Sequence, residues 1–536
     1  MGDLDAETDR ELLKDCFIDN GELSLLMNVK APESIVVGRT GAGKSAMLIQ
    51  IEEKAEHHKM LDPNNISIRF LEYSDIIQFF DSIGVNLDLF YKLLWRHIIT
   101  VEFLKMRYSL SSEKDSQGLL SRLQEFVDRD PVKKEALTYF KEWGEKFWLD
   151  TEEQLIEVVK KMSDELKSSV SSELIGVSLN LDGAKSLSEE RKTEIVSKAN
   201  RVVNQLQIRK LAKILDLLEE KVFVDEQKKY FLLIDRLDEN WADTNTRYRF
   251  IKALIEEIKT FRKINNIKII IALRKDLLDI VFDKTRDSGF QEDKNESYFL
   301  PLIWTRRDLF NLIQKRVSVV YKRQYTKKDV RFDDIFPSPR KGGGITAINY
   351  LLDRTLCRPR DALQFANECF IAALGSPRIS WKAISQAESN YSNKRLRSLF
   401  EEWGSIFPGL TETVEVLRGK PAVFTRNAIA ESLNDVVSKL IDYPNDPCGK
   451  AVIDYCKSNN STDTDVTFSI ISCLYRVGAI GVKVSTKEPF KWADYSQSIL
   501  SKSQILRINQ IKIHKMLRKT LGVREKDLFD KLLEAK

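Results

Sequence analysis

The feature that most constrains the fold is the eight-residue stretch GRTGAGKS, Gly38–Ser45. It follows the short apolar run SIVV and precedes KSAMLIQIEEKAE, whose apolar residues have helical spacing. In the order strand, glycine-rich loop and helix, backbone N–H groups converge on an anion at the amino end of the helix. The sequence therefore predicts a phosphate-binding loop at the carboxyl end of a buried strand.

The same stretch fits the P-loop pattern Gly-x4-Gly-Lys-Ser without exception. The Lys44 ammonium would contact the β and γ phosphates of ATP, and the Ser45 hydroxyl would be a ligand of Mg²⁺. The alternative is a chance glycine-rich turn, which the flanking strand and helix patterns disfavour. We expect the nucleotide to contact Gly38, Arg39, Thr40, Gly41, Ala42, Gly43, Lys44, Ser45 and Ala46.

Carboxylates follow a second apolar run, YFLLI, at Asp235, Asp238 and Glu239. Asp235 is predicted to hold the water shell of Mg²⁺, and Asp238 or Glu239 to orient the water that attacks ATP. A solvated helix start after the strand would accommodate these carboxylates without catalysis. We favour the catalytic interpretation because the two halves of a nucleotide site occur in the right order.

Several arginines are candidate phosphate contacts. Arg274 ends the apolar run IKIIIAL, and ligands of open α/β sheets bind at strand ends, so it is a candidate γ-phosphate sensor. Arg286, in a charged loop, is a weaker candidate for an arginine finger that reaches a neighbouring subunit. Arg358 and Arg360 precede an amphipathic helix, from which they could reach the nucleotide. The alternatives are a surface arginine at position 274 and a solvated pair at positions 358 and 360.

These patterns predict an α/β fold: a P-loop NTPase core with a parallel sheet, a large helical insertion, a helical lid and a C-terminal winged-helix domain. Weaker patterns predict a strand at 65–73, a β-hairpin within 171–188 and a strand within 296–304. The predicted segments are a helical segment at 1–30 that packs on the domain after it, a core at 31–330 with an insertion at about 76–227, a lid at 331–400, a winged-helix-like domain at 401–500 and a basic helical tail at 501–536.

The C-terminal third has the order of helices, glycine turn and β-hairpin that is typical of a winged helix. Its second helix, within 469–482, would end at Gly478, with the hairpin in 487–498. Helices that read DNA present several Lys, Arg, Asn or Gln residues, whereas this one presents only Arg476 clearly. We therefore favour protein packing or autoinhibition over sequence-specific DNA reading. The basic tail could contact nucleic acid or an acidic partner, although such a run is usually a solvated helix face.

Net charge, cysteine spacing and apolar runs bear on the partners, the metal sites and the cellular compartment of the protein. With 85 basic and 80 acidic residues, the formal net charge of +5 argues neither for nor against nucleic acid. The six cysteines lack CxxC spacing, which disfavours a zinc site and suits a reducing cytosol. No apolar run approaches the roughly 18 residues of a membrane span, and the start of the chain is acidic. We expect a cytoplasmic protein with no membrane contact.

The motif order resembles that of a known branch of ATPases. The P-loop, LLIDRLDENW, IIIALR, PLIWTRRDLFNLIQKRV and RPRDALQF occur in the order found in STAND and KAP-like P-loop ATPases, relatives of the AAA+ proteins. More narrowly, the chain is similar to bacterial ATPases with an Asp-x-Leu-Asp-x-x-Trp second motif and a trailing winged helix. The resemblance implies Mg-ATP bound at the P-loop, metal support from Asp235, catalysis aided by Asp238 and sensing by Arg274. The lid of origin-recognition-type initiators is also similar, which would make Arg360 a second sensor.

By this resemblance the chain is an ATP-driven switch that oligomerises with copies of itself. Such switches in bacteria often belong to antiviral or other conflict systems and act with a separately encoded effector. One alternative is an initiator or regulator in which ATP controls DNA binding through the winged helix. Another is a nucleotide-binding scaffold without turnover. The chain differs from STAND and KAP-like ATPases in two respects. Its insertion is long and carries no membrane segment, and no sensor repeat follows the predicted lid.

Overall fold

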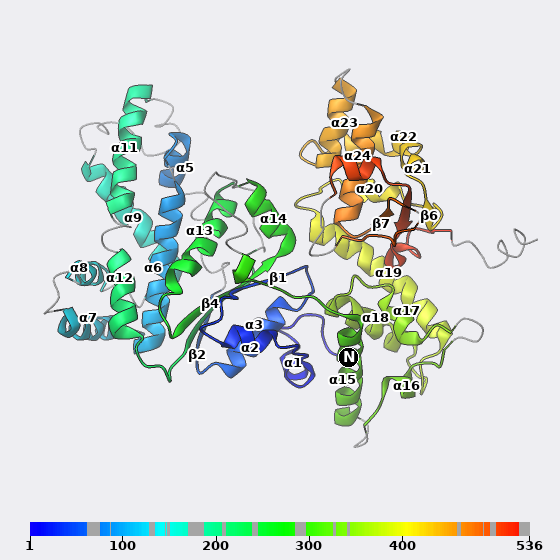
Figure 1. Ribbon diagram of the computed structural model, residues 1–536, viewed down its shortest axis with the longest axis horizontal. Coiled ribbons are helices and arrows are strands. Elements are labelled where there is room, and N and C mark those ends of the chain that lie inside the picture. The colour runs from blue at the N-terminus through cyan, green and yellow to red at the C-terminus, as the bar shows by residue number, and fades with distance from the viewer. Residues whose placement is uncertain are drawn as a thin grey trace, which may run out of the picture. The chain divides into compact units, whose positions relative to one another are not determined.

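The chain folds as an α/β protein with two compact units. The core unit comprises Asp19–Arg39 and Lys44–Leu302, and the C-terminal unit comprises Met1–Ile18, Thr40–Gly43 and Ile303–Lys536. The computed structural model (Figure 1) describes residues 1–61, 75–85, 87–127, 134–144, 146, 149, 151–169, 187–205, 211–237, 245–284, 296–324, 329–339, 344–457, 462–485, 487–493 and 500–524.

The core unit contains a five-stranded sheet with the order β2-β3-β4-β1-β5, and every pair of neighbours is parallel. Its central strands are buried on both faces, as their continuous apolar runs predict. Because the strands are parallel, their carboxyl ends meet at one edge, where Gly38 lies opposite Arg274. The strands are β1 (Ile35–Gly38), β2 (His57–Leu61), β3 (Tyr230–Ile234), β4 (Ile267–Arg274) and β5 (Phe299–Pro301).

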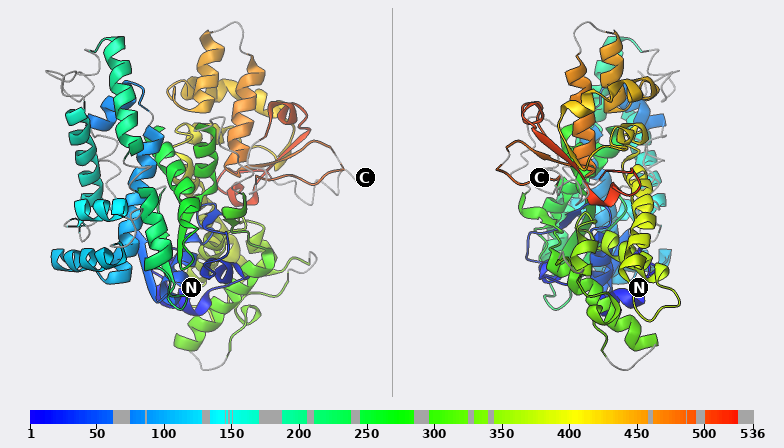
Figure 2. Two further views of the ribbon diagram at one scale, coloured as in Figure 1. Left: turned by 60° about the vertical axis from the view of Figure 1, so that its left-hand side comes forward. Right: turned by 90° about the vertical axis from the view of Figure 1, so that its right-hand side faces the viewer.

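Helices pack on this sheet and form the predicted insertion. Helix α3 contacts β1, β2 and β4, whereas α6 contacts β2 and β3 and extends into the insertion, where α9 and α11 pack against it (Figure 1, Figure 2). The helices are α2 (Glu22–Met27), α3 (Lys44–Lys54), α5 (Asp75–Ser82), α6 (Leu87–Tyr108), α7 (Glu113–Val127), α8 (Lys134–Trp143), α9 (Thr151–Ser169), α11 (Glu189–Gln205), α12 (Ala212–Leu217) with a π-helical turn at Leu218–Val222, α13 (Asn245–Phe261) and α14 (Lys275–Lys284).

The insertion is fixed to the core unit through α13. The Trp95 indole on α6 donates to the Phe250 carbonyl at 2.9 Å, and the Arg96 guanidinium forms two 2.8 Å bonds with the Glu257 carboxylate. The described residues between β2 and β3 are thus mainly helical, as the sequence predicted. The strand predicted at 65–73 and nearly all of the hairpin predicted within 171–188 lie outside them. Strand β2, which the sequence patterns missed, occupies the sheet position beside β3.

The C-terminal unit contains the helices described within 306–403, so α15 belongs to it rather than to the core unit. The sequence placed the boundary at 330/331, but the apolar face of α15 joins the lid core through Leu309, Ile313 and Val317. Helix α1 (Arg10–Cys16) also packs on α15, where Asp9 and Arg316 form a buried 2.5 Å ion pair, so only α2 of the N-terminal segment packs in the core unit. The lid helices are α15 (Arg306–Gln324), α16 (Phe332–Ile335), α17 (Ala347–Leu352), α18 (Pro359–Ala372) and α19 (Trp381–Trp403).

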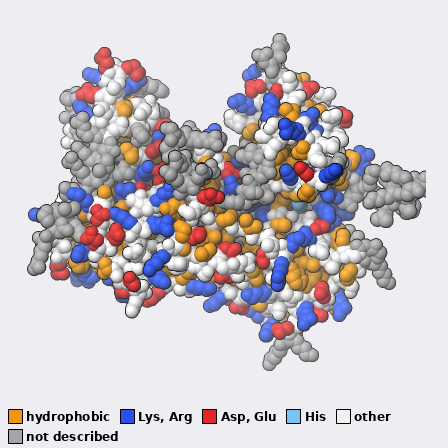
Figure 3. All heavy atoms as spheres, in the orientation of Figure 1, with side chains coloured by type: hydrophobic (Ala, Val, Ile, Leu, Met, Phe, Trp, Pro, Cys, Tyr) orange, Lys and Arg blue, Asp and Glu red, His pale blue; other side chains and the backbone are white. Residues whose placement is uncertain are grey.

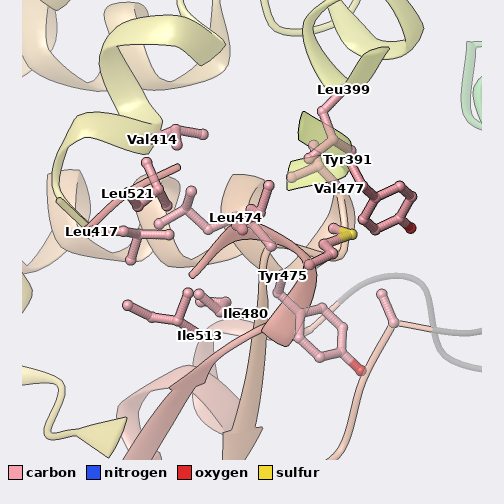
Figure 4. Packing of buried hydrophobic residues seen from close by; sticks show 14 of the residues in the cluster. Tyr391, Leu399, Val414, Leu417, Leu474, Tyr475, Val477, Ile480, Ile513 and Leu521 are labelled. Atoms are coloured by element: carbon pink, nitrogen blue, oxygen red, sulfur yellow. The ribbon is translucent and has the colours of Figure 1, made fainter. Parts of the chain in front are cut away.

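A domain of helices and a small three-stranded sheet completes the described part of this unit. Its antiparallel sheet has the order β6-β8-β7, and Figure 4 shows residues of α24 and of the strands packed into one core. Gly478, with φ +82°, follows the end of α24 as predicted. The elements are α20 (Leu410–Glu415), β6 (Val423–Phe424), α21 (Asn427–Ala430), α22 (Leu433–Leu440), α23 (Pro447–Lys457), α24 (Asp463–Arg476), β7 (Ile480–Lys483), α25 (Lys502–Leu506), β8 (Gln510–Ile513) and a 3-10 turn at Lys515–Leu517.

The prediction of a helical tail from 501 was wrong. Residues Gln510–Ile513 form the central strand of the small sheet, with Ile511 and Ile513 buried and Lys512 on the opposite face. Apolar and polar residues alternate with a period of two in this segment, which is the pattern of a strand with one buried face. The basic residues of the segment favoured the incorrect prediction of a helix. The domain therefore continues well beyond the predicted boundary at 500. None of the described helices, in either unit, has the length and apolar character needed to cross a membrane.

Candidate phosphate-binding site

The loop after β1 has the backbone that its glycines predict. Gly41 and Gly43 have φ values of +76° and +96°, a left-handed region in which a side chain is strained. Helix α3 begins at Lys44, directly after the loop. The N–H groups in the first turn of a helix have no partner within the helix and carry the positive end of its dipole. This arrangement is suited to an anion at the amino end of α3.

Lys44 lies over the start of this loop. Its ammonium group donates to the carbonyls of Gly38 and Arg39, both at 3.3 Å. Its side chain is half-buried, so the charge is held close to the loop backbone. The lysine thus lies against the loop to which the sequence assigns it.

Asp235 lies at the same edge of the sheet, immediately after β3. Its backbone N–H donates to the Leu61 carbonyl at 3.4 Å, and its carboxylate accepts from the N–H of Arg236 at 2.8 Å. Arg236 has a φ of +58°, which is unusual for a residue other than glycine and costs of order 1–3 kcal/mol. Such strain often accompanies functional sites, and the N–H of this strained residue binds the carboxylate. Asp238 and Glu239 lie outside the described residues.

Arg274 is at the predicted strand end but is paired with a carboxylate. Its Nε and Nη2 atoms donate to Asp276 Oδ1 and Oδ2 at 3.1 and 2.6 Å. This two-bond geometry holds the guanidinium in a fixed orientation at the sheet edge. The structure confirms the position of Arg274 and adds Asp276 as the residue that orients it. Arg286 lies outside the described residues.

The middle of the loop, Thr40–Gly43, belongs to the C-terminal unit, and other residues of that unit bind three of its backbone carbonyls. The Arg358 Nη1 atom donates to the Thr40 carbonyl at 2.8 Å, and the N–H of Arg360 donates to the Gly41 carbonyl at 3.3 Å. The Trp304 indole donates to the Ala42 carbonyl at 2.7 Å. The sequence patterns did not single out Trp304. Its place directly after β5, the strand beside β1, was the available signal.

Arg358 is part of a buried ionic cluster, which we call the α18 cluster: Arg358, Asp361, Arg395 and Glu402. Arg358 donates twice to Asp361, both at 3.1 Å, and once to Glu402 at 3.0 Å. Arg395 lies 3.5 Å from Asp361 and 3.4 Å from Glu402. The alternative of a solvated arginine pair is therefore wrong for Arg358, which is buried, whereas Arg360 is half-exposed.

The charges of this cluster outweigh the cost of burial. Burial raises the pKa of Asp361, but the guanidinium groups of Arg358 and Arg395 and a hydrogen bond from the Leu356 N–H lower that pKa to about 2. Burial lowers the pKa of Arg358, but Asp361 and Glu402 raise it above its ordinary value. Both groups are therefore charged at neutral pH, and the cluster anchors the arginine that contacts Thr40.

We expect Gly41→Ala to lower the free energy of unfolding by about 2–3 kcal/mol. The left-handed backbone costs an alanine roughly 1–2 kcal/mol, and its Cβ would lie 2.7 Å from the Cβ of Arg360, which must then shift. Gly419→Ala is the matched control, because Gly419 has a φ of +66° and no neighbour within 4 Å of the added atom. Urea denaturation followed by circular dichroism measures both. Equal losses in the two variants would contradict the close approach of Arg360 to the loop.

Comparison with known proteins identifies one part of the C-terminal unit. Residues 307–400, from α15 to the end of the lid, match the family model described as "FunZ-associated C-terminal helical domain". This match, like the packing of α15, begins the helical domain before residue 331. It does not include the glycine-rich loop at Gly38–Ser45 or the parallel sheet.

Two curated proteins are similar to this chain, one over most of its length and the other over a short part of it. The "Putative transposon gamma-delta 80.3 kDa protein" of Escherichia coli (strain K12) is 26% identical over 497 residues, which are 90% of this chain and 61% of that protein. The "Allergen Alt a 2" of Alternaria alternata is 30% identical over 125 residues, which are 23% of this chain and 65% of that protein. The chain thus spans less than two thirds of either relative. No solved structure matches.

Proposed function

We propose that the chain binds Mg-ATP on Gly38–Ser45, hydrolyses it, and acts as a nucleotide-dependent switch. One observation carries this proposal: a loop with two left-handed glycines leads from β1 into α3, and Lys44 and Asp235 lie at the same edge of the parallel sheet. Ligands of open α/β sheets bind at this edge, outside the carboxyl ends of the strands. The groups present there provide contacts for phosphate and oxygen ligands for a cation.

The oxygen donors at this edge fit magnesium. Mg²⁺ prefers hard oxygen ligands and keeps several waters, and Ser45 and Asp235 would supply a hydroxyl and a carboxylate to it and to its water shell. The metal, when bound, neutralises charge on the phosphates. The loop N–H groups and Lys44 would hold the phosphates, and Arg236 keeps the Asp235 carboxylate in place through its N–H. We assign Asp238 or Glu239 to orienting the attacking water, and Arg274 and Arg360 to sensing the γ-phosphate.

The switch would act through the loop backbone. The carbonyls of Thr40, Gly41 and Ala42 bind Arg358, Arg360 and Trp304 of the C-terminal unit. Phosphates that orient the N–H groups of the same peptides would bias these contacts, and with them α18 and α19. We place this switch, oligomeric and without membrane contact, in the cytoplasm of a bacterium. Its proposed setting is an antiviral or other conflict system with a separately encoded effector, by the resemblance of its motifs to such ATPases.

An ATP-controlled initiator that reads DNA with α24 has less support. The side chains of Val466, Ile470 and Leu474 on this helix are buried. Arg476 packs over the rings of Trp403 and Phe407, 5.8 Å from each centroid. The first turn of α24 carries Asp463 and Asp465, which would repel phosphates. This helix presents packing groups rather than base-reading groups.

The test of the proposal is binding of a fluorescent ATP analogue. We expect Lys44→Ala to raise the dissociation constant for mant-ATP and Mg²⁺ by about 10- to 100-fold, because a charge-assisted hydrogen bond contributes roughly 1.5–3 kcal/mol. Lys54→Ala, at the exposed end of α3, is the matched control and should bind as the wild type does. Equal affinity of Lys44→Ala and wild type would exclude this loop as the nucleotide site.

A further inference from the structure

The small sheet of the C-terminal unit has one apolar face and one basic face. Residues Ile480 and Val482 of β7, with Ile511 and Ile513 of β8, are buried in the domain core. Since side chains alternate along a strand, the residues between them lie on the opposite face. We call this face the sheet face; it comprises Val423, Gly481, Lys483, Gln510 and Lys512, together with Phe490 and Trp492, which pack on it.

The Phe490 ring lies beside both lysines of this face, and the Trp492 ring packs on Gly481. The ammonium groups of Lys483 and Lys512 lie 5.4 and 5.2 Å from the ring centroid of Phe490. The ring of Trp492 lies directly on Gly481, where an added Cβ would come within 2.6 Å of the indole. The chain returns along β7 through an antiparallel bridge between Val482 and Lys491. Both ammonium groups are thus placed near the same aromatic ring on this face.

Positive charge is in excess around Lys512. Burial lowers the pKa of Lys512, and the neighbouring charges of Arg518, Lys515 and Lys483 lower it further, whereas Asp353 raises it. Asp353 is already bound by Lys515 at 2.6 Å and by Arg306 at 2.8 Å. Within the described residues, no carboxylate forms an ion pair with Lys483 or Lys512. Figure 3 shows Lys and Arg side chains close together over the region where Figure 1 places β6 and β7.

We propose that the sheet face binds the phosphate backbone of double-stranded DNA without reading its sequence. Lysine ammonium groups are point charges that suit phosphates, whereas among the described residues of the face only Gln510 has the kind of fork that reads bases. Single-stranded binders stack bases on open aromatic rings. Here the Phe490 ring already faces two ammonium groups and the Trp492 ring lies on Gly481, which favours a duplex. The proposal does not depend on ATP binding.

The test measures binding of the full chain, without nucleotide, to a labelled duplex of about 30 base pairs and arbitrary sequence. Fluorescence anisotropy is recorded at several salt concentrations. We expect the double variant Lys483→Gln, Lys512→Gln to bind about 10-fold or more weakly at low salt. The slope of log affinity against log salt should fall by about 2, since each neutralised phosphate contributes roughly 0.9.

The matched control is Lys450→Gln, Lys457→Gln, which removes the same charge from exposed positions on α23. It should keep the wild-type affinity within about 2-fold. A second variant, Val423→Lys, adds a cation opposite Lys512 in the register of β6 and β8, and should tighten binding and raise the salt slope by about 1. It tests the proposal even if the double variant fails to fold.

Three results would overturn the proposal. The first is no binding of the duplex by the wild type at low salt. The second is an equal loss in the sheet-face and α23 variants, since only net charge would then matter. The third is competition by polyglutamate as effective as that by DNA at equal charge, which would indicate an acidic protein partner instead.

Discussion

Asp235→Asn is expected to lower the rate of ATP hydrolysis by about 100- to 1,000-fold while mant-ATP still binds within a few-fold of wild type. Asparagine keeps the size of the side chain and can still accept the 2.8 Å hydrogen bond from the Arg236 N–H. It removes the negative charge that would hold the magnesium water shell beside the phosphates. Binding depends mainly on the loop and Lys44, so hydrolysis and binding should separate in this variant.

The control for this variant is Asp225→Asn, before the other end of β3. The Asp225 carboxylate also accepts a backbone N–H, from Gln227 at 3.1 Å, but it precedes the strand instead of following it. Phosphate release by this control should equal that of the wild type. If Asp235→Asn hydrolysed ATP at the wild-type rate, the carboxyl end of β3 would have no part in the reaction, and the proposed role of Asp235 would be wrong.

The sequence could predict the structural features that depend on residues close together in the chain. The conformation of the glycine-rich loop depends on glycines at 41 and 43, on an apolar run before them and on helical spacing after them, all within a short stretch. The positions of Asp235 and Arg274 follow in the same way, because each comes at the end of an uninterrupted apolar run. Their common edge then follows from the parallel order of the strands.

The parts that could not be predicted depend on contacts between distant segments. Strand β8 is a short alternating stretch in a basic segment, and it becomes a strand by pairing with β6 and β7. Helix α15 follows the core in sequence, but its buried face is complementary to the lid. The role of Trp304 likewise exists only because Ala42, far away in the chain, places a carbonyl beside its indole. Local patterns carry no information on such pairings.

Asp361→Asn should lower the free energy of unfolding by about 3–5 kcal/mol at neutral pH. The substitution leaves Arg358 and Arg395 charged and buried with Glu402 as their remaining partner in the cluster. The loss should depend on pH. Because the folded-state pKa of Asp361, about 2, is below the ordinary 3.8, its stabilisation is present above 3.8 and is lost as pH falls toward 2. Urea denaturation at pH 7 and pH 3 should therefore show a smaller difference between variant and wild type at the lower pH.

Asp353→Asn provides the contrast that tests this explanation. Asp353 also binds two cations, Arg306 and Lys515, but its side chain is 30% exposed, whereas that of Asp361 is fully buried. Water screens a half-exposed pair, so this variant should lose only about 1 kcal/mol or less. Similar losses in the two variants would mean that burial of the α18 cluster does not determine its energy. A large loss in Asp361→Asn alone would show that the α18 cluster, which anchors Arg358, is a main determinant of the stability of the helices α15 to α19. The cluster would then also determine the contact between Arg358 and Thr40.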